Sequence, residues 1–524
     1  MTTPPRWVPK AVALVVALGG LMVVGNSVLE KPQISPEAAI ELSDEQSVGG
    51  ATTSSVRSTT ASTAPPSTAP PTTAAPSFTE FAGWVDPQSS GHPWSALGAV
   101  EGLLTFRGNP TRSFYGSGPV PANPKVIWTF DIGCANSPVG GENKQWCGSG
   151  WTGQPAIFHP PGNESAWWLA FGAYNRNVNF LDPDTGAVVY PPYATGDIIK
   201  GTITIDPDGF PLLYTGSRDN FFHVVALDRP EPTPLWKLAA DAVTPTLWND
   251  DWDGSGLVID DYLFEGGENS RIFVVKLNRG YDTAGLVTVD PEIVFSAPGW
   301  DDELLAAVNT DVSIENSVAV SGDTLYFANS GGLVQGWDLS TLTTGGEPAR
   351  VFRFWNGDDT DASIVIDDEG MLYVASEYER GNARAQELGQ VIKLDPSNPD
   401  NPLVWSREAS SGLDSGVWAT PALAGDLLVV STDDGRVLGL DRATGQERWV
   451  LNLPGPLWQS PVVVDNVLIQ GDCEGVLHGF DLTVSPPAPL WSVTLGGCIE
   501  STPAVWHGRI YVGSRNGTFY ALAD

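Results

Sequence analysis

The side chains best placed for chemistry in this sequence are carboxylates that recur in short polar loops between apolar runs. They are Asp197, Asp250, Asp251, Asp253, Asp311, Glu315, Asp358, Asp359, Asp361, Asp414 and Glu500. In the loop 251–256, oxygen-bearing residues stand at positions 1, 3 and 5 and glycine at position 6, as in calcium-binding loops. Position 12 is Tyr262 instead of glutamate, so Asp260 or Asp261 would have to supply a ligand. We therefore predict either an ordinary Asp-Gly turn or a calcium site built from Asp251, Asp253, Ser255 and Asp260.

Aromatic and basic side chains stand in the same loops and in the hairpins beside them. A mixture of tryptophan, arginine and carboxylate suits a glycan or a peptide segment. The predicted ligand-binding residues are Trp151, Trp418, Trp458, Arg176, Arg218, Arg515 and Glu500. The alternative is that the tryptophans only fill space between structural elements.

Catalytic constellations are missing from the sequence. The 5 histidines do not pair at a metal-ligand spacing. There is also no Gly-x-Ser-x-Gly, phosphate-loop or haem-attachment motif. We predict no catalytic residue, and calcium is the cofactor for which candidate ligands exist.

A repeat positions these loops. Residues 417–524 contain one pattern nearly three times, with a hydroxyl residue before a proline at Thr420, Ser460 and Thr502. The period is about 40 residues, in the range of solenoids and propellers. Each copy holds four short runs rich in Val, Ile, Leu and Tyr, with glycine-containing turns between them and no helical spacing. Four strands joined by hairpins make a propeller blade, which predicts an all-β fold.

Two parts of the repeat also carry a family resemblance. Residues 511–522 contain Tyr-Val-Gly-Ser, Asn-Gly and Tyr-Ala-Leu, and residues 440–449 contain Leu-Asp, Thr-Gly and Trp. Both resemble the repeat of the PQQ-like (quinoprotein alcohol dehydrogenase-like) β-propellers, closely over 405–524 and more weakly over 128–405. That superfamily includes quinoprotein dehydrogenases and non-catalytic relatives, such as the lipoprotein that assists outer-membrane barrel assembly.

The blades can be counted by their closing aromatic strands, centred near Tyr190, Trp236, Phe295, Phe352, Trp405, Trp449 and Trp491. An eighth blade begins at Thr502 without such a strand, whereas residues 125–130 form a closing strand with no blade before it. We predict that the two ends pair, giving an eight-bladed propeller of four-stranded blades over 125–524, with seven blades as the alternative. Residues 81–124 are an irregular lead-in, and residues 376–391 are an insertion in a hairpin.

Four cysteines, Cys134, Cys147, Cys473 and Cys498, make an even number in a chain that we expect to be exported. Sequence alone allows three connectivities. In a four-stranded blade, the middle hairpins and the loops between blades lie on one face. This geometry favours disulfides Cys134–Cys147 and Cys473–Cys498.

The N-terminal residues have the composition of a membrane anchor and a spacer. Two basic residues precede the apolar run 11–29, which suits a transmembrane helix with residues 1–10 as a cytoplasmic tail. A cleaved signal peptide is the alternative. Residues 30–80 include a Ser/Thr/Pro/Ala-rich stretch, which predicts a disordered linker. The body is therefore expected outside the cytoplasm.

The formal charge of −35 disfavours nucleic acid and anionic lipid surfaces as partners. We predict a membrane-anchored, extracytoplasmic propeller that binds or scaffolds an unknown protein, peptide or cell-wall glycan. The first alternative is a quinoprotein dehydrogenase using PQQ and calcium. In those relatives, the resemblance implies a disulfide between adjacent cysteines over the quinone, which this chain lacks, so we do not expect PQQ. The second alternative is a glycan-binding sensor ectodomain.

Overall fold

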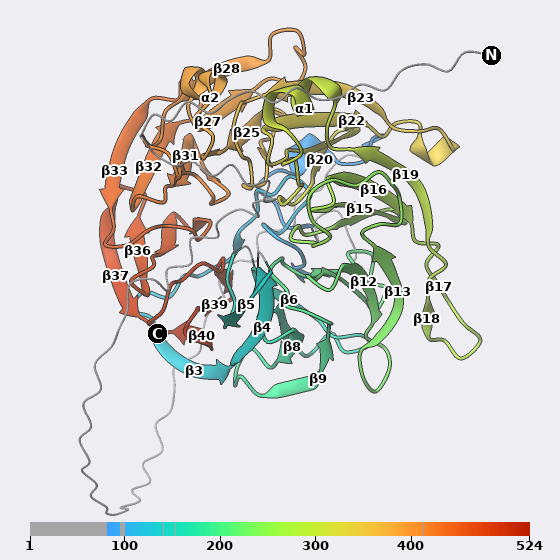
Figure 1. Ribbon diagram of the computed structural model, residues 1–524. Helices are drawn as coiled ribbons and strands as arrows, with labels where there is room; N and C mark the ends of the chain where they lie inside the picture. The colour runs from blue at the N-terminus through green and yellow to red at the C-terminus, as the bar shows by residue number, and fades with distance from the viewer. Residues whose placement is uncertain (1–80, 95–99, 140, 152, 411) are drawn as a thin grey trace, which may run out of the picture.

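The computed structural model describes residues 81–94, 100–139, 141–151, 153–410 and 412–524 (Figure 1). The predicted tail 1–10, membrane segment 11–29 and linker 30–80 lie outside these residues. Within the described part of the chain, no helix has the length and apolar character needed to cross a membrane.

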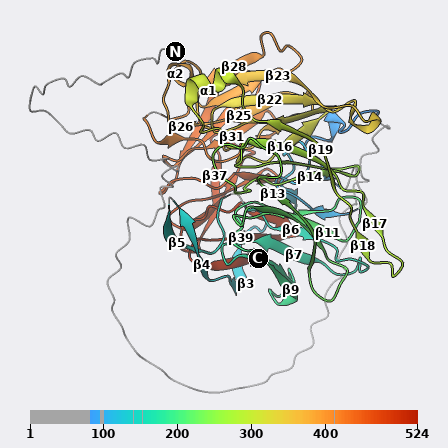
Figure 2. The same cartoon turned by 45° about the vertical axis from the view of Figure 1, so that its right-hand side comes forward.

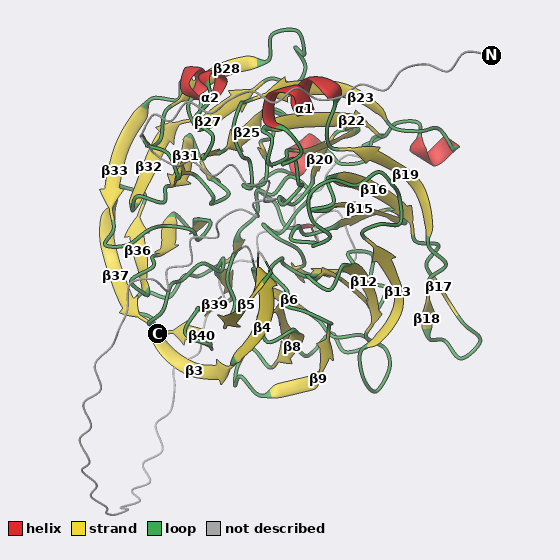
Figure 3. Ribbon diagram, in the orientation of Figure 1, coloured by secondary structure: helices red, strands yellow, loops and turns green. Residues whose placement is uncertain are grey.

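Eight blades of four antiparallel strands stand around a central axis, and the sheets of blades 1 and 8 each gain a fifth strand from the lead-in (Figures 1 and 3). Blades 1 to 4 are β6–β9 (Ala156–Phe158, Trp168–Gly172, Asn177–Leu181, Val188–Ala194), β10–β13 (Thr204–Ile205, Leu212–Gly216, Phe221–Ala226, Thr233–Ala239), β14, β15, β16 and β19 (Leu257–Ile259, Tyr262–Gly266, Arg271–Lys276, Glu292–Pro298), and β20–β23 (Ala319–Ser321, Thr324–Phe327, Leu333–Asp338, Ala349–Trp355). Blades 5 to 8 are β24, β25, β27 and β28 (Val365–Ile366, Leu372–Ala375, Val391–Leu394, Leu403–Arg407), β30–β33 (Ala422–Ala424, Leu427–Ser431, Arg436–Asp441, Glu447–Asn452), β34–β37 (Val462–Val464, Val467–Gly471, Val476–Asp481, Ala488–Thr494), and β38–β40 (Ala504–Trp506, Arg509–Gly513, Thr518–Ala523) with β3 (Lys125–Asp131).

The ring closes where its two ends pair. Strand β3 lies antiparallel to β40, with Trp128 opposite Ala521, and completes blade 8. The C-terminus accordingly lies beside β3 (Figure 1). Both the eight-blade count and the pairing of the unmatched strand are confirmed.

At two of the junctions between neighbouring blades, a tryptophan of one blade packs on a glycine of the next. Trp405 of blade 5 lies against Gly445 in the β32–β33 turn of blade 6, and its Nε1 donates to Arg442 O at 3.0 Å. A Cβ at Gly445, where φ is +70°, would stand 2.7 Å from the indole. Trp128 packs on Gly186 in the same way. This contact accounts for the Thr-Gly and Trp of the repeat.

On the inside, a belt of hydrogen bonds joins the blades. We use the name hydroxyl belt for the residues that stand two positions before each innermost strand, which are Gln154, Thr202, Ser255, Ser317, Ser363, Thr420, Ser460 and Thr502. The backbone N–H of one member donates to the hydroxyl of the next, as from Ser317 to Ser363 at 2.9 Å and from Ser363 to Thr420 at 3.0 Å. The hydroxyl residue of the repeat is therefore a link between blades.

The lead-in crosses the centre of the ring and touches every blade. Its strands β1 (Gly102–Leu103) and β2 (Gly116–Ser117) pair with blades 1 and 8. Backbone atoms of residues 104–111 bond to blades 2, 4 and 5. The buried Arg107 donates to carbonyls of blades 6 and 7, and the buried Arg112 donates to carbonyls of blades 3 and 4.

Candidate ligand-binding face

One face of the ring carries the loops between blades and the middle hairpins; we call it the interblade face. Other additions to the blades lie on it too. They are the hairpin β4–β5 (Cys134–Val139, Glu142–Cys147), helix α1 (Asp302–Val308), and, in the 376–391 insertion, β26 (Glu377–Tyr378), which pairs with β29 (Ser415–Gly416), and α2 (Ala383–Leu388). Figure 2 shows β4, β5, β26 and α2 on the same side of the ring. The hairpin β17–β18 (Gly280–Tyr281, Val287–Thr288) projects elsewhere, from the rim of blade 3.

Directly before the hydroxyl belt, equivalent positions of the interblade loops form what we call the axial ring. Its members stand two residues before each belt residue and are Lys200, Asp253, Glu315, Asp361, Trp418, Trp458 and Glu500. The eighth position, 152, lies outside the described residues. Blades 2 to 5 thus contribute charged side chains and blades 6 and 7 contribute tryptophans. Aligning the repeats on the hydroxyl residue would have found this ring from the sequence.

On the charged side, an ammonium group stands among carboxylates at blades 2 and 3. Lys200 Nζ lies 2.5 Å from Asp253 Oδ2 and 3.6 Å from Glu268 Oε1, and all three side chains are buried. Burial alone would lower the pKa of Lys200, but Asp253 and Glu268 hold it above its usual value. Carboxylate oxygens of Asp253, Glu268 and Glu315 all lie within 4.8 Å of one another. The lysine therefore already supplies positive charge to this carboxylate triad.

The structure brings together only part of the predicted calcium loop. Asp251 pairs with Arg218, and Ser255 Oγ donates to Thr202 O at 2.9 Å. Asp260 stands in the turn between β14 and β15, at the other end of β14 from the loop, so it does not join Asp251 and Asp253. Burial and then the nearby Glu268 raise the pKa of Asp251 to about 7.

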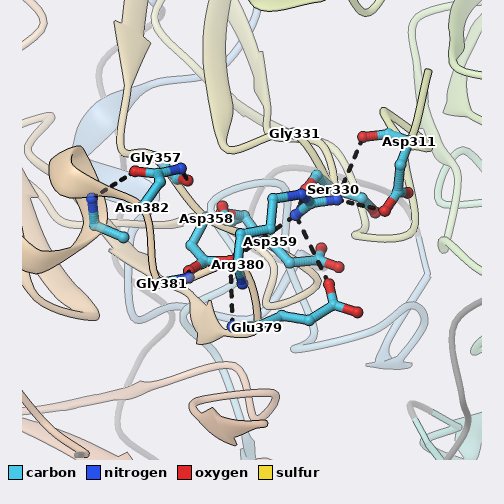
Figure 4. A network of polar contacts seen from close by, with 12 residues as sticks. Asp311, Ser330, Gly331, Gly357, Asp358, Asp359, Glu379, Arg380, Gly381 and Asn382 are labelled. Atoms are coloured by element: carbon cyan, nitrogen blue, oxygen red, sulfur yellow. Dashed lines mark hydrogen bonds and ion pairs between the residues drawn. The ribbon is translucent and has the colours of Figure 1, made fainter. Parts of the chain in front are cut away.

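A second carboxylate triad, Asp359, Asp361 and Glu377, lies at blade 5, with oxygens again within 4.8 Å of one another. Hydrogen bonds and an ion pair hold the 376–391 insertion beside this triad (Figure 4). The buried Asp358 carboxylate accepts the backbone N–H groups of residues 379, 380 and 381 at 3.2, 2.9 and 2.9 Å. Arg380 then reaches Ser330 O at 2.5 Å and pairs with Asp311. The chain's own arginine thus stands among these acids.

The aromatic side of the face gathers three predicted residues. The rings of Trp418 and Trp458 lie 5.9 Å apart, and Trp151 Nε1 donates to Trp418 O at 3.4 Å. Trp151 comes from the loop before blade 1 and Trp418 from the loop before blade 6, so the contact spans the axis. All three side chains are half-buried.

The predicted basic residues stand at separate places on this face. Arg515 pairs with Glu500, with Nη1 3.1 Å from both carboxylate oxygens, and lies over the ring of Tyr174. Arg176 lies 3.7 Å from Asp197, and Arg218 belongs to the charged side through Asp251. The predicted set is therefore divided among three parts of the face.

Both disulfides pair as predicted and lie on the interblade face. Cys134–Cys147 links β4 to β5, and Cys473–Cys498 links the middle hairpin of blade 7 to the loop that follows that blade. Each disulfide therefore crosslinks a segment of the interblade face.

Comparison with known proteins gives similarities of two kinds. A family model described as outer membrane protein assembly factor BamB matches residues 176–450 and 387–484. BamB from Nitrosomonas eutropha (strain DSM 101675 / C91 / Nm57) is 25% identical over 169 residues, which are 30% of this chain and 36% of that protein. The aligned part is thus little more than a third of that relative.

Two solved structures share the architecture. A quinohaemoprotein alcohol dehydrogenase from Comamonas testosteroni aligns with a TM-score of 0.52 and 12% identity, over 80% of each chain. A europium-containing methanol dehydrogenase aligns with a TM-score of 0.54 and 13% identity, over 81% of this chain and 98% of that one. At these identities the likeness shows the fold alone.

Proposed function

Because the chain belongs to the PQQ-like β-propeller family, whose matching model is described as outer membrane protein assembly factor BamB, we propose that it is a non-catalytic scaffold of the cell envelope. In this proposal the interblade face holds a segment of a partner protein. The observation that carries the proposal is that the axial ring has charged side chains on one side and tryptophans on the other. On the charged side Lys200 and Asp253 are buried and paired with each other, whereas Trp418 and Trp458 are half-buried. Half-buried aromatic side chains beside polar groups are typical of protein-binding surfaces.

A location outside the cytoplasm is part of the proposal. Two disulfides support it, because such bonds persist in oxidising compartments. We propose that residues 11–29 anchor the chain and residues 30–80 space the propeller from the membrane. Membrane fractions should then hold the full-length chain, and external protease should release the propeller by cutting near 54–77. Recovery of only a secreted form beginning near residue 30 would contradict the anchor.

A quinoprotein dehydrogenase remains the enzymatic alternative, and the axial residues fit its cofactor poorly. PQQ is an anionic quinone, whereas Asp253, Glu315, Asp361 and Glu500 bring four carboxylates to the ring. The basic member of the ring, Lys200, is already held by Asp253. The disulfide partners stand 13 and 25 residues apart in the sequence, so neither bridge joins adjacent cysteines. Stoichiometric PQQ binding with dye reduction would overturn the scaffold proposal.

Site-specific photo-crosslinking in native cells tests the binding face. A photoreactive residue at Leu413 or Pro456 probes the interblade face, and one at Asn163 or Asp368 probes the opposite face as a matched control. Leu413 is 62% exposed and the other three positions are also exposed. We expect a discrete protein adduct from the interblade positions alone. Equal labelling of both faces would refute the proposal. Crosslinking of the interblade positions to glycan and not to protein would favour the glycan-binding alternative.

A further inference from the structure

Carboxylates stand in the same interblade loops as the half-buried tryptophans and in the middle hairpins next to those loops. We call the set Trp151, Trp418, Trp458, Asp414, Asp433 and Glu474 the tryptophan–carboxylate patch. Asp433 Oδ1 accepts the N–H of Gly416, two residues before Trp418, at 2.9 Å. The exposed Asp414 stands in the same loop. A Cβ on Gly455, in the loop that leads to Trp458, would lie 3.2 Å from Glu474 Cγ.

These groups are available to a ligand. Across the described residues, Asp414, Asp433 and Glu474 form no ion pair, and no lysine or arginine lies over the rings of the three tryptophans. The neighbouring Arg436 makes its ion pair with Asp434, with Nη2 2.6 Å from Oδ2, and the nearby Asp433 helps to raise the pKa of Arg436. The patch therefore combines aromatic faces with carboxylates that make no direct ion pair.

The same face shows what such a combination binds. Arg515 lies over the rings of Trp146 and Tyr174, with its guanidinium carbon 5.2 and 5.0 Å from their centroids. Its Nη1 stands 3.1 Å from both oxygens of Glu500. A guanidinium held by aromatic rings and a carboxylate is thus already built here from the chain's own residues. The patch offers the rings and the carboxylates without the arginine.

We propose that the tryptophan–carboxylate patch binds an arginine side chain from an extended basic segment of the partner protein. The proposal rests on the proposed function and specifies the chemistry of that partner. Arginine fits better than lysine because its planar guanidinium stacks on indole while its N–H groups pair with carboxylates. The net charge of −35 attracts a basic segment from a distance. A neutral glycan would stack on the indoles and donate its hydroxyls to the carboxylates, but it would leave their negative charge unneutralised.

Binding of short labelled peptides to the full-length chain, in an uncharged detergent, tests the chemistry. The probe has two arginines spaced by glycines, with blocked ends. Its matched controls replace arginine by citrulline, which keeps the shape and removes the charge, or by lysine. We expect the arginine peptide to bind at least about tenfold more tightly than the citrulline peptide, with the lysine peptide between them. Equal affinities for the arginine and citrulline peptides, or tighter binding of lysine, would overturn the inference.

Paired variants locate the binding. Trp418→Leu/Trp458→Leu and, separately, Asp414→Asn/Asp433→Asn should each weaken the arginine peptide by about tenfold. The conservative Trp418→Tyr/Trp458→Tyr should retain part of the affinity, which separates lost stacking from lost folding. Trp167→Leu and Asp368→Asn/Glu369→Gln are the controls on the opposite face, and the latter removes the same charge. Equal weakening by controls and patch variants would mean that only the acidic surface as a whole attracts the peptide.

The peptide and crosslinking results separate the two proposals. If residue 413 captures a partner but the arginine peptide does not bind, the partner binds the face through other contacts and this inference is wrong. If the peptide binds at the patch but no position captures a protein in cells, the proposed function is wrong. Loss of crosslinking in the Trp418→Leu/Trp458→Leu chain would support both.

Discussion

Replacement of Arg107 by methionine tests whether the lead-in holds the ring together. The side chain is fully buried, and its guanidinium donates to Pro461 O at 2.5 Å, to Thr420 O at 3.2 Å and to Pro421 O. It also lies 4.2 Å from the ring centroid of Tyr115. Methionine keeps the length and the apolar stem but leaves the carbonyls of blades 6 and 7 without these donors.

The magnitude follows from two opposing effects. Three buried carbonyls that each lose a partner cost about 2 kcal/mol apiece, roughly 6 kcal/mol together. Burial lowers the pKa of Arg107 from 12.5 to about 10, so removing the buried cation returns about 3 kcal/mol. We expect a net loss of about 3 kcal/mol in the free energy of unfolding.

Urea unfolding followed by tryptophan fluorescence measures this loss. In a protein of this size we expect the midpoint to fall by about 0.5–1 M. Arg509→Met is the matched control, because Arg509 pairs with the exposed Asp184 on the surface and should contribute about 1 kcal/mol or less. If Arg107→Met and Arg509→Met unfold at the same urea concentration, water replaces the guanidinium and the lead-in is not a structural hub.

Three further predictions concern closure, pH and calcium. A chain truncated to 132–524 loses β3 and the lead-in and should aggregate, whereas 81–524 should stay monomeric; light scattering that finds 132–524 monomeric and cooperatively melting would contradict the closure. Burial raises the pKa of Asp433 to about 6, and burial with Glu268 raises that of Asp251 to about 7. Between about pH 4 and these values, each carboxyl keeps its proton in the folded chain, whereas it has ionised in the unfolded chain. The melting temperature should therefore fall as pH rises from about 4 to 7, and Asp433→Asn should flatten the slope between about 4 and 6; an unchanged slope would refute this assignment. Arg218 and Lys200 already pair with Asp251 and Asp253. We therefore expect calcium to raise the melting temperature no more than sodium chloride does at matched ionic strength. An extra rise with calcium that is lost in Asp251→Asn/Asp253→Asn would show instead that the loop binds calcium.

The repeat made the fold predictable because some of its residues have the same structural role in more than one blade. Trp405 and Gly445 join neighbouring blades, and the hydroxyls of Thr420 and Ser460 belong to the belt. The unmatched strand around Trp128 predicted the ring closure, since a strand without a sheet needs a partner. Both disulfides followed from the shared face of the loops that carry them.

The site was less predictable because axial neighbours come from different blades. Glu268 and Glu315 stand 47 positions apart yet share a carboxylate triad with Asp253. The calcium pattern in 251–256 did not reveal that Lys200, from the preceding interblade loop, would pair with Asp253. The role of Arg107 was also missed, because an arginine in an irregular segment gives no sign that it reaches two blades.

Hydrogen exchange on the purified complex with its native partner tests the central claim most directly. The account predicts slower exchange on complex formation in the interblade loops 412–421 and 453–461, with no change in the turns 367–370 and 159–167 on the opposite face. Slower exchange confined to those opposite turns, or no difference between the free and the complexed chain, would contradict the proposal that the interblade face binds the partner.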